Sequence, residues 1–155
     1  MEEKLSTLSK VLDEALDELY RKDKSLLERQ VHERTIVFRL GIYIQELMNK
    51  YGGFEGFNLD FEYNRNVSDV KRLPGWENGA YPDLIVHKRV ENDFNLLVME
   101  FKTYWNPECT VDSDKIKEFV NPCGDYRYRC GKSILLGRTR NKVRIKTFFP
   151  QKNSD

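Results

Sequence analysis

The sequence predicts one α/β domain in which a mixed β-sheet is flanked by helices. The chain has 155 residues, of which 39% are hydrophobic and 33% charged, and this size and composition suit one compact domain with its own core. Apolar residues recur at helical spacing near the N-terminus, and later in runs or alternation at strand spacing. No internal repeat or low-complexity tract interrupts this order.

The first predicted element is a helix from Leu5 to Leu26, about five turns long. Its apolar residues are separated by three, four, three, four and seven positions and are Leu5, Leu8, Leu12, Ala15, Leu19 and Leu26. The stripe suits packing on the chain's own domain better than on the same helix of a second copy, because it covers few heptads. Dimerisation through this helix stays a hypothesis. We treat residues 1–29 as a helical extension of the domain over residues 30–150, with a polar tail at residues 151–155.

A second helix is predicted over residues 30–50, with a core-facing stripe that includes Val37 and Leu40 and an end at Gly52-Gly53. Glu33 lies four positions before Val37 and therefore shares the buried face at the start of the helix. Acidic residues are also favoured in the first turn of a helix because they interact with the helix macrodipole, and this needs no functional site. Glu33 is thus either a site residue or an ordinary helix-start carboxylate.

Strand patterns and one further helix fill the rest of the chain. Alternating apolar residues predict a strand, and the later apolar runs predict two hairpins, the first with a central second strand that is apolar on both faces. The segment rich in glycine and proline between the first two strands is predicted to be a loop. In chain order these elements are the strand 57–63, the loop 65–80, the hairpin 84–86 with 96–99, the helix 113–120, and the hairpin 132–137 with 143–149.

Charge, apolar runs and cysteines exclude several classes of protein. The net charge of +1 creates no global basic field, so any affinity for nucleic acid must be local. The sequence has no apolar run of about eighteen residues and opens with Met-Glu-Glu-Lys rather than a signal segment, so we expect a soluble, cytoplasmic protein without a membrane partner. Cys109, Cys123 and Cys130 match neither a disulfide framework nor a paired zinc motif, and we interpret them as reduced structural thiols.

The hairpin at residues 84–99 brings three ionisable residues together. A turn near Glu91 sets Asp83 opposite Glu100 and Ile85 opposite Val98, and directly opposed residues project from the same face. Lys102 returns to this face two residues after Glu100. Two adjacent carboxylates repel each other unless a hard divalent cation lies between them, which favours Mg²⁺ or Mn²⁺.

This set of groups suits phosphodiester hydrolysis. A divalent cation activates water and neutralises charge on a phosphate, while the ammonium of Lys102 orients the attacking water or stabilises the transition state. The carbonyl of Phe101 is a further candidate ligand for the metal. The alternative interpretation is a surface ion-pair cluster at the rim of the sheet.

These residues resemble the PD-(D/E)XK nuclease superfamily, through Tyr81-Pro82-Asp83 followed by Glu100-Phe101-Lys102. The resemblance implies a restriction-endonuclease-like core of helix, three strands, helix and strand, to which the order from Gln30 to about Phe149 is similar. It also implies an acidic residue from the first core helix, which Glu33 matches by position. The segments most similar to small stand-alone bacterial or phage members are His32-Glu33-Arg34, Asp60 to Arg65, Pro82 to Arg89 and Asn95 to Val98.

Further residues are weaker candidates for the same site. Glu62, and less so Asp60, lies on the polar face of the first strand, where it would reach the metal, face water or pair with Arg65. His87 shares the face of Asp83 and is a candidate for substrate contact or proton transfer, although a packed histidine is the commoner case.

Basic residues in two segments are candidates for contact with nucleic acid. Arg127 and Arg129 alternate with Tyr126 and Tyr128, and Lys132 follows in the same stretch, a pattern that also fits buried aromatics beside solvated arginines. Lys71 and Arg72 lie in the long predicted loop, which fits a clamp or a solvated loop equally well.

The sequence therefore predicts a nuclease dependent on Mg²⁺ or Mn²⁺, with DNA favoured over RNA as its partner. A non-catalytic binding or regulatory protein on the same fold is the alternative, as is an accessory subunit of a defence or repair complex. A homodimer is also compatible with the sequence. No major-groove reader or zinc module is recognisable, so the substrate sequence cannot be read.

Overall fold

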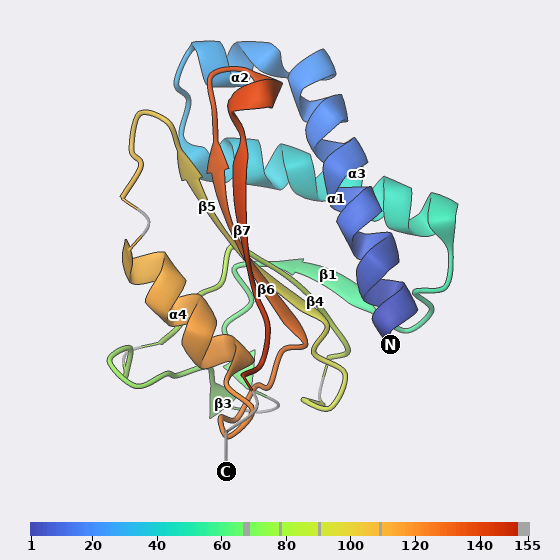
Figure 1. Cartoon of the computed structure of the whole chain (residues 1–155), viewed down its shortest axis with the longest axis vertical. Coiled ribbons are helices and arrows are strands. Elements are labelled where there is room, and N and C mark those ends of the chain that lie inside the picture. Colours follow the sequence, from blue (N-terminus) through green and yellow to red (C-terminus); the bar gives the residue numbers. More distant parts are fainter. Residues whose placement is uncertain (67–68, 78, 90, 109, 152–155) are drawn as a thin grey trace.

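A five-stranded mixed sheet runs through the centre of the molecule (Figure 1). β5 and β6 are parallel, and the other neighbouring strands are antiparallel, which confirms the predicted mixed sheet and the central place of the strand that begins near Leu97. The structure is a computed structural model that describes residues 1–66, 69–77, 79–89, 91–108 and 110–151, without the side chains of 110–112. The strands lie in the order β1 (Asn58–Phe61), β4 (Leu84–His87), β5 (Leu97–Thr103), β6 (Cys130–Leu136) and β7 (Arg144–Phe148).

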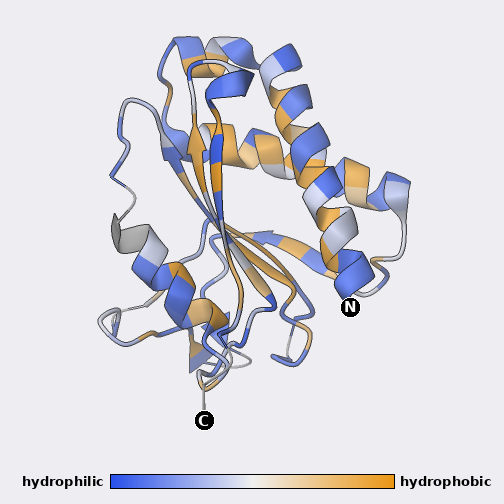
Figure 2. Cartoon of the chain, viewed as in Figure 1, coloured by the Kyte–Doolittle hydropathy of each residue, from blue (hydrophilic) through white to orange (hydrophobic). Residues whose placement is uncertain are grey.

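The two faces of the sheet carry separate hydrophobic cores. The helices α1 (Glu2–Lys22), α2 (Lys24–Glu28) and α3 (Glu33–Tyr51) cover one face, and α4 (Thr110–Val120) covers the other. Because side chains alternate along β5, Leu97, Met99 and Phe101 enter the first core and Val98 enters the second. By the same alternation Glu100 and Lys102 belong to the α4 face. In Figure 2 the strands of the sheet are coloured largely as hydrophobic, with hydrophilic stretches among them, and hydrophobic and hydrophilic residues alternate along the helices.

The first predicted helix is interrupted at Asp23, where α1 ends and α2 begins. The carboxylate of Asp23 accepts hydrogen bonds from Tyr43 (2.6 Å) and Arg39 (3.0 Å), both on α3. These bonds tie the junction to α3, a long-range interaction that the local periodicity does not contain. The stripe itself packs inside the domain as expected, with Leu8, Leu12, Ala15 and Leu19 buried.

The second helix begins at Glu33, three residues later than predicted, because His32 caps it. The Nδ1 atom of His32 accepts a hydrogen bond from the backbone N–H of Arg34 (3.3 Å). The helix ends where predicted, at Gly52, whose φ of 70° is easily adopted only by glycine.

The predicted loop at residues 65–80 contains a small hairpin of β2 (Arg65–Asn66) and β3 (Asp69–Val70). The segment is folded onto the α4-side core, since Leu73 and Ala80 are buried. The final hairpin is confirmed, with the 3-10 turn η1 (Arg140–Lys142) between β6 and β7. No helix within the described part of the chain has the length and apolar character needed to cross a bilayer. Cys109 lies outside the described residues, Cys123 is exposed, and Cys130 is a buried free thiol.

Candidate active site

The four main residues predicted from the sequence line one cavity of about 430 Å³. Glu33 comes from the start of α3, Asp83 from the residue before β4, and Glu100 and Lys102 from β5. The cavity is also lined by His32, Arg34, Glu62, Tyr81 and Lys115.

The β4–β5 pairing has the predicted register. Leu84 pairs with Met99 and Ile85 with Val98, and continuing this register by one residue sets Asp83 opposite Glu100. Asp83 stands immediately before β4, and its Oδ2 atom accepts a hydrogen bond from the backbone N–H of Phe101 (2.7 Å). This bond holds the carboxylate beside the segment that carries Glu100 and Lys102.

Glu100 is a buried carboxylate, 3% exposed, and is paired with a residue that the sequence did not indicate. The Nζ atom of Lys115, on α4, lies 2.8 Å from Oε1 of Glu100 and donates a hydrogen bond to the carbonyl of Tyr81 (2.7 Å). Lys115 thus joins α4 to β5 and to the approach to β4. The sequence carried one weak indication of this role for Lys115. It lies four residues before the core residue Phe119, and this spacing places it beside the packed face of the helix.

Glu33 and Lys102 lie near each other in the cavity lining. The Nζ atom of Lys102 is 3.8 Å from Oε1 of Glu33, and each side chain is 24% exposed. Glu62 also lines the cavity, and its Oε1 atom pairs with Nε of Arg34 (2.8 Å) rather than with Arg65. The lining of the cavity therefore mixes carboxylates and cations.

The donor set suits an open metal site rather than a closed cage. Across the described ranges, no group of three or more His, Cys, Asp and Glu side chains is arranged to hold a metal ion. Mg²⁺, however, is usually held by only one or two carboxylates together with waters and substrate phosphates. Asp83 and Glu100, with the carbonyl of Phe101, fit that requirement.

His87 and Asp60 lie outside the cavity and form a cluster of their own. His87 is 3% exposed, and its Nε2 atom is 2.8 Å from Oδ2 of Asp60, which also accepts a hydrogen bond from Nε of Arg89 (2.9 Å). Burial alone would raise the pKa of Asp60, but the hydrogen bonds from His87 and Arg89 hold that pKa well below its usual range. His87 is thus the packed, hydrogen-bonded histidine of the alternative interpretation and is not brought to the site.

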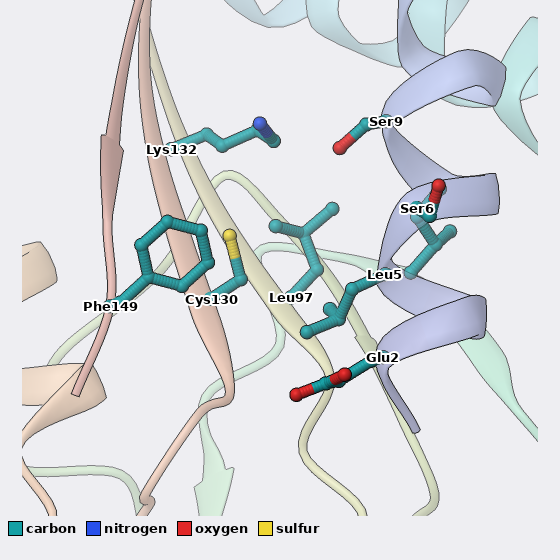
Figure 3. Close-up of a pocket in the computed structure, with 9 residues that line it drawn as sticks. Glu2, Leu5, Ser6, Ser9, Leu97, Cys130, Lys132 and Phe149 are labelled. Carbon is teal, nitrogen blue, oxygen red and sulfur yellow. The ribbon is translucent and has the colours of Figure 1, made fainter.

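The structure contradicts two of the predicted nucleic-acid contacts. Lys71 is 2% exposed and lies among aromatic rings, so it cannot reach a phosphate. Lys132 is 9% exposed and lies on the α1 face of the sheet, where its Nζ atom donates a hydrogen bond to Thr147 (3.2 Å). Lys132 lines a cavity of about 360 Å³ together with Leu5, Leu97 and Phe149 among others. Figure 3 shows its side chain pointing toward α1.

The other basic candidates are exposed and do not line the candidate cavity. Arg127 and Arg129 are solvated beside the buried Tyr126 and Tyr128, as one interpretation of the alternation predicted. The backbone of Arg129 is bonded to Asn95, before the start of β5, whereas the site uses the second half of that strand. The side chain of Arg72 is exposed too, and its backbone N–H donates a hydrogen bond to the hydroxyl of Tyr126 (2.7 Å).

Comparison with known proteins assigns no family to this chain. No family model matches it, and no curated protein does. Among solved structures the chain is similar to the crystal structure of SSO0001, with a TM-score of 0.39 and 13% identity over 92% of this chain and 67% of that chain. A likeness at this level supports no conclusion about the function of the chain, which has to be argued from its own site.

Proposed function

We propose that this chain is a metal-dependent nuclease of the PD-(D/E)XK type, which hydrolyses phosphodiester bonds in nucleic acid. The observation that carries the proposal is the convergence of Asp83, Glu100, Lys102 and Glu33 on one cavity. Residues from three separate parts of the chain meet there, and the pairing of β4 with β5, continued by one residue, sets Asp83 opposite Glu100.

The order of elements around the site supports the same proposal. The helix α3, the strands β1, β4 and β5, the helix α4 and the strand β6 follow one another as helix, three strands, helix and strand. On this proposal they form a restriction-endonuclease-like core, with α1, α2 and β7 as additions.

The residues divide the chemistry among them. When bound, Mg²⁺ or Mn²⁺ supplies Lewis acidity and makes water a better nucleophile at neutral pH. Asp83, Glu100 and the carbonyl of Phe101 would hold the cation, and Glu33 would support it directly or through water. Lys102 offers a fixed ammonium to the charge that develops on the phosphate during hydrolysis.

Lys115 and Arg34 have supporting roles in this proposal. Lys115 balances the buried negative charge of Glu100 and positions its carboxylate through the 2.8 Å ion pair. The side chain of Arg34, 68% exposed at the mouth of the cavity, can contact a phosphate next to the scissile one.

A second candidate function is favoured by the ion pairs themselves. Because Glu100 pairs with Lys115, and Lys102 lies near Glu33, the cavity already balances much of its own charge. Such a network also suits a non-catalytic nucleic-acid-binding or regulatory protein on the same fold, alone or within a larger defence or repair complex.

Cleavage assays separate the two candidates. Purified protein is incubated with supercoiled plasmid, single-stranded DNA and RNA in Mg²⁺ or Mn²⁺, with EDTA as the metal-free arm. We expect metal-dependent cleavage that falls about 100-fold or more in Asp83→Ala and Lys102→Ala, because each removes charge used in the transition state. Glu46→Ala, an exposed change on α3, serves as the control and should keep full activity. Cleavage that persists in both site variants, or no cleavage of any substrate by the wild-type protein, would contradict the proposal.

A further inference from the structure

Two rows of residues extend from the candidate site across the sheet to its edge strand. In one row Glu100 pairs with Ser133, and Ser133 pairs with Lys146. In the next row Lys102 pairs with Leu135, which pairs with Arg144. Directly paired residues project from the same face, so Arg144 and Lys146 lie on the face that carries the site.

A surface cavity lies beside these basic residues, on the other flank of α4 from the candidate site. Its volume is about 610 Å³, and its walls include Ser133 from β6, Arg144 and Lys146 from β7, and Lys117 from α4. Lys115, only two residues from Lys117, lines the site cavity. Both cavities therefore reach the middle of the same helix.

The positive charges that line this second cavity are accessible to a ligand. Arg144 and Lys146 are exposed, and no ion pair within the described residues involves either of them. Lys117, by contrast, is paired with Asp114 (2.8 Å). Lys146 lies over the ring of Phe148, with Nζ 5.1 Å from the centroid, which supports its long side chain. An exposed pair of cations on a chain of net charge +1 is the local basic surface that affinity for a polyanion requires.

We propose that Arg144 and Lys146 bind the phosphodiester backbone of the substrate strand to one side of the scissile phosphate. This inference rests on the proposed nuclease function and adds the direction in which the substrate extends. Because α4 lies between the two cavities, the substrate strand would pass over this helix between the site of cleavage and the two basic residues. They are substrate-binding residues, because they contact the substrate strand away from the reacting atoms.

The binding test uses the full chain in EDTA, with a fluorescein-labelled oligonucleotide offered single-stranded or as a duplex, and anisotropy recorded across a salt series. The variant R144Q/K146Q should raise the Kd about tenfold. The association constant falls with salt, and the variant should make the negative slope of its logarithm against log salt shallower, by about 1.4 for a single strand or about 1.8 for a duplex, the values for two lost phosphate contacts. The matched control K10Q/K50Q removes two exposed charges from α1 and α3 and should bind as the wild type does.

Cleavage kinetics with the same variants distinguish failure of this inference from failure of the nuclease function. We expect R144Q/K146Q to raise KM and leave kcat within about twofold, because the lost contacts act on binding rather than chemistry. Cleavage that depends on Asp83 but has unchanged KM and Kd in R144Q/K146Q overturns this inference and leaves the function standing. Binding that weakens equally in R144Q/K146Q and K10Q/K50Q also overturns it. If binding depends on Arg144 and Lys146 but the wild type cleaves no substrate, the nuclease function is overturned. The two residues then remain a nucleic-acid-binding surface.

Discussion

At the scale of single residues, Lys71 is the side chain whose surroundings depart furthest from those expected of its type. Its Nζ atom donates a hydrogen bond to the hydroxyl of Tyr128 (3.2 Å) and lies 5.2 to 5.7 Å from the centroids of four aromatic rings. Burial lowers the pKa of Lys71 to about 7, against the opposing effect of the negative charge of Asp60. The ring faces offset part of the cost of holding a cation there.

This burial predicts a pH dependence of stability that Lys71→Met should remove. In the unfolded chain the lysine keeps its proton up to about pH 10, so between about pH 7 and pH 10 the unfolded state binds more protons than the folded state. The free energy of unfolding of the wild type should therefore rise with pH across this window, by at most about 1.4 kcal/mol per pH unit. Urea denaturation at several pH values measures the slope, and Lys10→Met, an exposed change, is the control. Equal slopes in the wild type and Lys71→Met would refute the assignment.

The candidate site shows which residues local sequence rules can reach. Asp83, Glu100 and Lys102 could be predicted together because the period of a strand and the register of a short hairpin determine which side chains share a face. Lys115 could not, because its contact with Glu100 depends on where α4 docks. The burial of Lys71 and Lys132 could not be predicted from the sequence either, because lysine is rarely buried and only tertiary packing encloses it.

At the scale of elements, the close packing of α4 on the sheet depends on one glycine in β6. A Cβ atom at Gly131 would overlap Cγ2 of Ile116 and lie 3.1 Å from Cγ1 of Val120, both on α4. The helix can approach the strand closely only because this position has no side chain. Since Lys115 directly precedes Ile116, the same close approach brings its ammonium to Glu100.

Gly131→Ala should therefore destabilise the fold, by about 1–3 kcal/mol, through overpacking. Gly41→Ala on α3 is a matched comparison, because a Cβ there would meet the Leu84 side chain at 3.5 Å, an ordinary contact. That second variant should be neutral or gain up to about 1 kcal/mol from the higher helix propensity of alanine. Urea midpoints of the two variants provide the measurement, and equal destabilisation of both would show that Gly131 has no special packing role.

The elements that were predicted correctly are those with strong local periodicity. The apolar runs of β4 and β5 and the stripe of α3 predict both their type and their buried sides. The break at Asp23 was missed because its hydrogen bonds come from Tyr43 on another helix. The hairpin of β2 and β3 was missed because its strands are only two residues long and carry no alternation of apolar residues.

At the scale of the whole molecule, the fold separates two kinds of surface. Most of the buried apolar area lies between the sheet and the N-terminal helices, whereas the face under α4 combines a smaller core with the ionisable residues of the site. The mixed sheet could be predicted because consecutive strands are usually neighbours and a helix between two strands favours a parallel pair. A near-neutral net charge gave no indication that Arg144 and Lys146 gather on one face, since that depends on register with β6.

Metal binding at the candidate site should be visible in the stability of the whole fold. A cation that binds only the folded chain stabilises it by mass action, by about 1.4 kcal/mol at ten times its Kd. For a domain of this size, that raises the Tm by about 3–6 °C. Millimolar Mn²⁺ should therefore shift the thermal transition of the wild type, measured by circular dichroism, and should leave Asp83→Ala unchanged because that variant lacks one of the two carboxylates. Glu46→Ala, whose carboxylate is exposed elsewhere on α3, should shift as the wild type does. If the wild type shows no shift, or Asp83→Ala shifts equally, the carboxylates do not bind the cation and the non-catalytic function becomes the better account of this fold.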